Sequence, residues 1–388
     1  MPKRPAKWRI LALLPDWLYY GREIERGLLE FAERHEEVRL IHGSDTANPV
    51  REVRSARPDG IVAFVDSAAA AAYLARQNLT VVHVAAYRRA DSRRSVVSDD
   101  AAVGRMAAEY LRGRGFGHFA YVGPSGWHFA ERRRVAFVDC LRDHGLEALV
   151  YDADDLPLQN RQRRVPATAA LHRWVCGLPR PAVVFCAVDR LAASVAAVCR
   201  EERIRVPDDL AILGAGNDDL LCLTTDPPLS SIQIDGRRIG HKAGELLVSL
   251  LGGKRQRRAP IEVPPGNVVT RRSTDVLATS DDDLSEALRF IRERAVERIS
   301  VGDVADHVSI SRTGLIKKFR RHLDRSPLEE IRRVRIDRAK QLLAETDLSM
   351  LAIADQSGFM QSQSFATVFR KVVGLTPTAY RRQFRSRE

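Results

Sequence analysis

Residues 309–343 read SISRTGLIKKFRRHLDRSPLEEIRRVRIDRAKQLL, and residues 353–382 read IADQSGFMQSQSFATVFRKVVGLTPTAYRR. The two stretches match at an offset of 50 residues, with these pairs: Leu315 and Phe365, Phe319 and Phe369, Arg320 and Arg370, Ser326-Pro327 and Thr376-Pro377. From residue 284 onward, helical patterns are joined by short turns and no strand pattern occurs. The repeat therefore predicts an all-α domain built from two copies of one helical unit.

The first copy has the sequence features of a helix-turn-helix. Ser300 and Asp303 have the spacing of a capping box, and Ser311 can cap a second helix after a short turn. The apolar positions of the two helices recur every three or four residues: Val304, Ala305, Val308, Leu315 and Phe319. This spacing places them on one face of each helix, so the helices are expected to pack against each other.

The second copy repeats this arrangement. Ser349 can cap its first helix, Gly358 can adopt the left-handed conformation that ends it, and a second helix is predicted from about Ser362. The expected inward residues are Ile353, Ala354, Phe365 and Phe369.

The remaining positions of the second helices are polar and can face DNA. A major groove accepts one helix, whose N-terminal residues reach the base edges; Lys pairs with guanine and Gln with adenine. The residues expected to bind DNA are Arg312, Thr313, Gly314, Lys317, Arg320, Ser362, Gln363, Thr367, Arg370 and Arg382. Phosphate contacts are expected for further basic residues: Arg321, Arg332, Arg333, Arg335, Lys371 and Arg381. A solvated helix face is the alternative for any one arginine, so the duplicated motif carries the prediction.

At these residues the sequence resembles the AraC/XylS family of transcription regulators, over about residues 284–384. The resemblance implies two helix-turn-helix motifs held by one long helix, about residues 328–344, that read successive major grooves. The chain departs from the family pattern in its second recognition helix. Gln363 and Thr367 stand where Ser and Arg are common, and Gln361 replaces the usual acidic or hydroxyl cap.

The rest of the chain alternates short apolar runs with helical patterns from residue 8 to about 263. The runs expected to be buried parallel strands are Ile10–Leu14, Ile61–Val65, Val81–Val84, Phe119–Val122, Val183–Cys186 and Ala211–Leu213. Segments such as Glu23–Glu33 and Ala102–Arg112 have helical periodicity. This alternation predicts an α/β fold with parallel sheets flanked by helices, in two lobes with a cleft at the carboxyl ends of the strands.

The domain boundaries follow from composition. Residues 264–283 are rich in Pro, Ser, Thr and Asp and lack apolar periodicity, as is typical of a linker. We expect a ligand-binding domain over residues 1–263, a linker over 264–283 and the DNA-binding domain over 284–388. A length of 388 residues fits this division because one hydrophobic core rarely grows so large.

The N-terminal domain resembles the sugar-binding domains of LacI-type repressors and periplasmic binding proteins. The resemblance lies in SVVSDDAAVGRMAAEYLRGRGFGHFAYVG, FAERRRVAF, RVPDDLAILG and LSSIQIDGRRIGHKAGELL. Such a domain ahead of an AraC-type domain is similar to the arrangement in xylose-operon activators. The resemblance implies a sugar effector, and family habit favours activation over repression, although both would use the same DNA contacts.

A sugar site needs charged groups that bind neighbouring hydroxyls and an aromatic wall. Residues of these types at predicted strand ends and loop starts are Asp16, Trp17, Tyr19, Tyr20, Arg132, Asp189 and Asn217. The resemblance places Arg132 and Asp189 where that family grips its sugar. A helix-terminal charge and a helix cap are their structural alternatives, and Tyr20 could equally be a packing residue. Gly216 stands where related sensors often carry Asp, which leaves the sugar open.

An enzyme and a transporter's sugar-binding protein are the competing classes. The sequence has no Gly-rich phosphate loop, HExxH or G-x-S-x-G motif, and no cofactor or metal is expected. Its five cysteines, in apolar context, are expected to be reduced core thiols. The apolar run near the N-terminus is short and has no cleavage site, so a buried strand is expected rather than a signal peptide.

The predicted protein is therefore a cytoplasmic transcription regulator and not an enzyme. Its expected partners are double-stranded operator DNA, a small sugar, RNA polymerase and a second copy of the chain in a homodimer, without a membrane. The net charge of +12 permits a polyanionic partner but does not select DNA.

Overall fold

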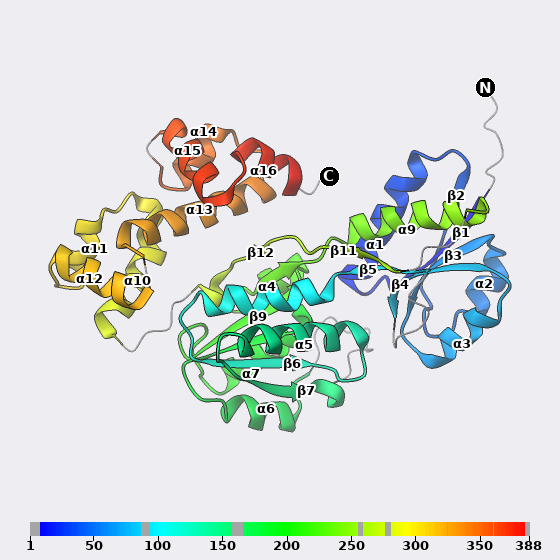
Figure 1. Cartoon of the computed structure of the whole chain (residues 1–388), viewed down its shortest axis with the longest axis horizontal. Coiled ribbons are helices and arrows are strands. Elements are labelled where there is room, and N and C mark those ends of the chain that lie inside the picture. The colour runs from blue at the N-terminus through cyan, green and yellow to red at the C-terminus, as the bar shows by residue number, and fades with distance from the viewer. Residues whose placement is uncertain are drawn as a thin grey trace. The chain divides into compact units, whose positions relative to one another are not determined.

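The computed structural model describes residues 8–86, 94–156, 166–254, 259–275, 281–323, 325–359 and 361–384. It forms two compact units: residues up to Thr274 except Gly113–Phe116, and residues from Asp275 onward together with Gly113–Phe116. The first is an α/β unit of two lobes and the second is helical, which confirms the predicted fold class (Figure 1). Within the described part of the chain, no helix is long and apolar enough to cross a membrane.

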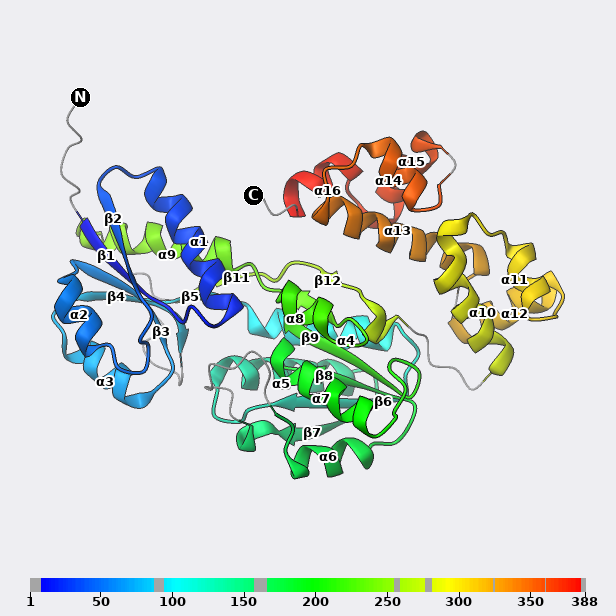
Figure 2. The same cartoon turned by 180° about the vertical axis from the view of Figure 1, so that it is seen from behind.

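Lobe 1 contains a four-stranded parallel sheet in the order β2-β1-β3-β4. Its strands are β1 (Trp8–Leu13), β2 (Val38–Gly43), β3 (Gly60–Val65) and β4 (Thr80–Ala86). Helices α1 (Tyr19–Glu33) and α9 (Gly236–Leu251) cover one face, and α2 (Val50–Ala56) and α3 (Ala68–Arg76) lie on the other, as Figures 1 and 2 show. Every residue of β3 is buried, as expected for a parallel strand covered on both faces.

Lobe 2 contains a six-stranded sheet in the order β12-β10-β9-β8-β6-β7, parallel except for β12. Its strands are β6 (His118–Gly123), β7 (Ala148–Asp152), β8 (Ala182–Cys186), β9 (Leu210–Gly216), β10 (Ser230–Gln233) and β12 (Val268–Val269). Its helices are α4 (Asp100–Arg112), α5 (His128–Arg142), α6 (Ala169–Cys176), α7 (Asp189–Glu201) and α8 (Asp219–Thr224). The strands lie between α4 and α6 in both views (Figures 1 and 2).

Three passages of the chain connect the lobes. The first follows β5 (Val96–Ser98), the second runs from β10 to α9, and the third follows β11 (Ile261–Val263). Strands β5 and β11 pair in parallel, so two of the passages begin side by side. Two lobes joined by a few short segments can close around a ligand by bending at those segments.

The range expected to be a linker, 264–283, contains ordered structure that belongs to the α/β unit. Strand β12 pairs with β10, and a short 3₁₀ helix, Arg272–Thr274, follows it. Ser273 and Thr274 are fully buried, and the Ser273 hydroxyl donates to the carbonyl of Ile212 at 2.6 Å. Polar composition did not reveal this packing because buried hydroxyls, rather than apolar side chains, hold the segment.

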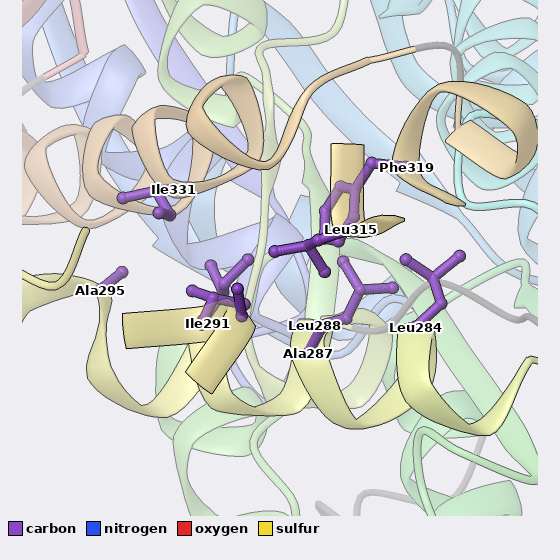
Figure 3. Close-up of a cluster of buried hydrophobic side chains, with 10 residues drawn as sticks. Leu284, Ala287, Leu288, Ile291, Ala295, Leu315, Phe319 and Ile331 are labelled. Atoms are coloured by element: carbon purple, nitrogen blue, oxygen red, sulfur yellow. The ribbon is translucent and has the colours of Figure 1, made fainter. Parts of the chain in front are cut away.

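The second unit consists of helices in two groups that share one long helix. The helices are α10 (Asp282–Arg294), α11 (Val301–His307), α12 (Arg312–Leu323), α13 (Pro327–Glu345), α14 (Met350–Gln356), α15 (Ser362–Val373) and α16 (Pro377–Phe384). Figure 3 shows Leu284, Leu288 and Ile291 of α10 facing Leu315 and Phe319 of α12 in the first core. The second core gathers Ile336, Ala339, Ile353, Phe365 and Phe369, among others.

The predicted helix boundaries agree with the caps in the structure. Ser300 and Asp303 form a capping box at the start of α11, and the Ser349 hydroxyl accepts from the backbone N–H of Ala352. Gly358 is left-handed with φ of 79°. The long helix expected at about 328–344 is α13. Local capping and the apolar stripes therefore define the two helix-turn-helix units.

Candidate ligand pocket and nucleic-acid interface

A cavity of about 230 Å³ lies between the two lobes of the α/β unit. Lobe 1 lines it with residues that end β3 and β4 or follow β1 and β3, and lobe 2 with residues that end β9 or follow β6, β8 and β9. These are the carboxyl ends of parallel strands, where doubly wound sheets bind ligands. The cavity therefore has the position and enclosure of an effector site.

Aromatic side chains line much of this cavity. They are Trp17, Tyr19, Tyr20, Phe64, Trp127 and Phe129. The Tyr20 hydroxyl donates to the carbonyl of Val84 at 2.9 Å, and burial raises its pKa above the ordinary value for tyrosine. Tyr20 is therefore a neutral hydroxyl that joins the end of β4 to the cavity wall. Flat aromatic faces of this kind suit the apolar faces of a sugar ring.

Two arginines from the first turns of α5 reach the cavity in different states. Arg132 forms an ion pair with Glu262 of β11, and its side chain is 32% exposed. Arg133 is buried, lies 2.7 Å from Asp100 of α4 and donates to the carbonyl of Ala187 at 2.6 Å. Burial raises the pKa of Asp100, while the neighbouring Arg133 opposes that rise. Arg132 is thus the accessible cation of the pair, and Arg133 is held within the wall.

Asp189 begins α7 with its side chain buried at the cavity. Its carboxylate accepts from the Ser231 hydroxyl at 2.5 Å and from the backbone N–H of Asp218 at 2.8 Å. Burial raises the pKa of Asp189 to about 6. Gly216, where related sensors often carry Asp, would place a Cβ atom 2.9 Å from this carboxylate. The Asp189 carboxylate therefore lies where a side chain at position 216 would begin.

Five of the seven predicted ligand residues line the cavity: Trp17, Tyr19, Tyr20, Arg132 and Asp189. The other two lie apart from the lining. Asp16 is exposed, and the Asn217 amide oxygen accepts from Arg271 at 2.9 Å. Both residues follow a strand end and are direct chain neighbours of lining residues. Their own side chains are nevertheless not part of the cavity wall.

Asp100, Arg133 and Arg190 also line the cavity and were not predicted from the sequence. Arg133 shares the buried face of α5 with Phe137 and Leu141, so its spacing of four and eight residues from them was an available signal. The Arg190 guanidinium lies 5.3 Å from the centre of the Trp17 ring, within the range of a cation–π contact. No local sequence pattern pairs residues so far apart in the chain.

The cysteines are free, as predicted, but they are not all core residues. Cys186, Cys199 and Cys222 are buried, and burial raises the pKa of each thiol. Cys140 is half-buried and Cys176 is exposed, so the prediction of core positions was wrong for these two. Both lie on amphipathic helices, where an apolar neighbourhood in sequence includes the solvent-facing side.

The second helix of each helix-turn-helix unit presents its predicted DNA-facing residues to solvent. On α12, Arg312, Thr313, Lys317 and Arg320 are exposed and Gly314 is half-buried. On α15 and α16, Gln363, Thr367, Arg370 and Arg382 are exposed. The side chain of Ser362 lies outside the described residues. Since Leu315, Phe319, Phe365 and Phe369 are buried, each helix keeps one polar face available for a groove.

Three of the arginines expected to contact phosphates make contacts within the protein. Arg333 forms ion pairs with the buried Glu330 and with Asp337. Arg335 donates to backbone carbonyls of Ala295 and Ile299, and Arg381 donates to that of Leu348. Their positions on packed helix faces, rather than their charge, determine these contacts.

Two family models match the two units of the chain. A periplasmic-binding-protein-like domain matches residues 108–274, and a helix-turn-helix domain matches residues 304–383. The first match covers lobe 2 from the end of α4 onward together with α9, and the second covers α12 to α16 with most of α11. The lobe 2 wall of the cavity and the paired polar helices therefore lie largely within domains of known type.

Similar proteins extend the likeness to the whole chain. The xylose operon regulatory proteins of Haemophilus influenzae and Escherichia coli K12 are each 29% identical to it; the alignments cover 93% of this chain and 95% and 94% of those proteins. A solved structure of the xylose-binding transcription activator xylR is 28% identical, with a TM-score of 0.63 over 98% of this chain and 99% of that one. A LacI-family regulator from Mycobacterium smegmatis, 21% identical, shares the fold with a TM-score of 0.58, over 70% of this chain and 100% of that one.

The chain is a DNA-binding transcription regulator that joins a periplasmic-binding-protein-like sensor to an AraC-type helix-turn-helix domain. It is a homologue of the xylose operon regulatory proteins over nearly its whole length. Because these relatives are regulators, the prediction that the chain is not an enzyme is confirmed.

Proposed function

We propose that this regulator binds a neutral sugar, a pentose such as xylose or a close relative, in the cavity between its lobes and activates a sugar-catabolism operon in response. It acts in the cytoplasm as a homodimer on operator DNA, and it contacts RNA polymerase. The single observation that carries the proposal is the cavity at the carboxyl strand ends, with aromatic walls and charged groups from both lobes.

The chemistry of the cavity supports a polyhydroxylated ligand. A guanidinium from Arg132 and a carboxylate from Asp189 can each bind neighbouring hydroxyls, and Trp17 and Tyr20 can cover an apolar ring face. Arg132 is only partly exposed and Asp189 is buried, so a ligand that reaches them leaves bulk water. The names of the relatives, which refer to xylose, point to the same class of ligand.

Lobe closure is the proposed link to transcription. The cavity contains residues from both lobes, so a ligand that contacts both stabilises the closed arrangement over the open one. The lobes are joined through three passages, which can act as hinges. The sensor and the DNA-binding unit are parts of one chain, so a change in the sensor can alter how the helix-turn-helix units meet DNA.

A thermal-shift screen of the full chain against pentoses, hexoses and uronic acids tests the ligand class. A sugar at 100 times its Kd stabilises the binding state by about 2.7 kcal/mol, which raises the melting temperature. A reporter gene behind the bound operator then tests activation with and without that sugar. A screen in which uronic acids bind and neutral sugars do not would contradict the neutral-sugar proposal, and a reporter repressed by the protein would contradict activation.

A further inference from the structure

The two helix-turn-helix units have separate hydrophobic cores. Helix α13 supplies Ile331 to the first core and Ile336 to the second, so it spans both. One shared helix fixes the distance between two units, but rotation of a unit about that helix is limited only by further contacts. The structure contains such contacts beside α13, where the turn after α14 meets the end of α10.

Gly358 makes one of these contacts through its backbone. A Cβ atom at this position would lie 2.8 Å from the carbonyl oxygen of Ala295 and 2.9 Å from the Cα of Val296. Ala295 is fully buried in the first core, whereas Gly358 follows α14 of the second helix-turn-helix. The backbones of the two units therefore touch at a point where any larger residue would push them apart.

Arg335 of α13 binds the same backbone segment through hydrogen bonds. Its Nε–H donates to the carbonyl of Ala295 at 2.8 Å, and Nη2 donates to that of Ile299 at 3.1 Å. Its Nε also lies 3.1 Å from the point that a Cβ atom would occupy if position 358 carried a side chain. An exposed ion pair between Arg298 and Asp355 closes the edge of the contact, although exposed pairs contribute little stability.

We propose that Gly358, Arg335 and Ala295 form a seam that fixes the orientation of α15 relative to α12, so that the protein accepts only one spacing between its two half-sites. The proposal rests on the proposed function, in which both helices read successive major grooves. One inserted base pair moves a half-site by about 3.4 Å and rotates it by about 35°. A rigid pair of helices cannot follow that rotation, while a loosened pair can.

The test uses the full chain and duplexes obtained by selection from random DNA with the wild-type protein. Binding is measured on the selected operator and on versions with one base pair added or removed between the half-sites. We expect the wild type to lose at least about tenfold in affinity at either altered spacing. Gly358→Ala should bind the selected operator more weakly and discriminate between spacings by about threefold or less.

Gly374→Ala is the matched control. Gly374 has the same φ of 79°, so both substitutions impose the same left-handed strain, but its Cβ position has no atom within 4 Å. The control should therefore keep the wild-type discrimination. Arg335→Met retains the aliphatic stem and removes both hydrogen bonds, and it should relax spacing in the same way. It decides the question if Gly358→Ala does not fold.

The seam is refuted if Gly358→Ala and Arg335→Met both discriminate between spacings as the wild type does. It is also refuted if the wild type needs both half-sites but binds all three spacings equally. A separate duplex with one half-site scrambled tests the proposed function. A wild type that binds this duplex as tightly as the selected operator refutes reading by two helices and, with it, the seam.

Discussion

Arg133 lies 2.7 Å from Asp100, with both side chains less than a tenth exposed. The pair joins α5 to the start of α4, and Arg133 also binds the carbonyl that follows β8. Three elements of lobe 2 thus meet at one buried ion pair beside the cavity. A buried charge that loses its partner is strongly destabilising, so this pair is expected to be essential to the shape of the wall.

Asp100→Ala should lower the free energy of unfolding by about 3–5 kcal/mol, because it leaves the Arg133 guanidinium buried without its carboxylate. Asp139→Ala is the control on α5: it breaks the exposed pair with Arg142 and should change stability by less than about 1 kcal/mol. Urea denaturation of the full chain measures both. Equal losses in the two variants would show that the buried pair has no special structural role.

Asp189 should make the sensor's stability depend on pH. Burial raises its pKa in the folded protein to about 6, above the ordinary value of 3.8, so the folded state holds the proton more tightly than the unfolded state. The contribution is fully present below about pH 4 and is lost as pH rises through 6. Relative to Asp189→Asn, the wild type should gain roughly 1 kcal/mol between pH 7.5 and pH 5.

The measurement is the denaturation midpoint of each protein at the two pH values. Because the comparison is a difference between two proteins, the titration of other groups cancels. If the difference in stability between the wild type and Asp189→Asn stays constant with pH, Asp189 does not carry this proton. The same conclusion follows if the wild type loses stability relative to Asp189→Asn as pH falls.

Sequence predicted the central strands and the DNA-binding helices because their local patterns are unambiguous. The runs at 61–65 and 183–186 are apolar throughout, and they form the fully buried β3 and β8. The edge strands β2 and β7 were not named because they are half exposed and carry polar residues, as in VRLIHG. An edge strand needs only one buried face and therefore lacks a continuous apolar run.

The cavity was harder to predict than the fold because it depends on contacts between distant residues. Strand ends identified Trp17, Arg132 and Asp189, which do line the cavity. Strand ends could not reveal that Arg133 pairs with Asp100, because 33 residues separate them. The rotation of α5 decides which of the two adjacent arginines is partly exposed at the cavity and which is buried in its wall. The sequence indicates that rotation only through the apolar stripe of the helix.

The two recognition helices should read different half-sites. Lys317→Ala should change base preference in one half-site and Gln363→Ala in the other, each costing about 1–3 kcal/mol, because both exposed side chains point away from the buried stripe. Arg382→Ala should weaken binding to all sequences alike and reduce the salt dependence. The half-sites should lie about 10 bp apart.

Binding to a panel of single-base operator variants measures these preferences, and footprinting measures the spacing. An Arg382→Ala protein with an altered base preference would assign that residue to base contacts instead of phosphate contacts. A footprint with a single protected groove per monomer would contradict reading by both helices.

Arg132 and Asp189 should provide the grip on the sugar. Truncating either one leaves hydroxyls or a charged partner without hydrogen bonds in an enclosed site, which costs about 1–3 kcal/mol, or about 5- to 150-fold in Kd. Arg134→Ala is the control, since Arg134 pairs with Glu131 on the same helix and does not line the cavity. Calorimetry with the sugar found by thermal shift measures all three variants. If Arg132→Ala and Asp189→Ala both keep the wild-type affinity, the sugar binds elsewhere. Because coupling between sites is reciprocal, operator DNA should also change the sugar affinity of the wild type by the same factor by which sugar changes its DNA affinity.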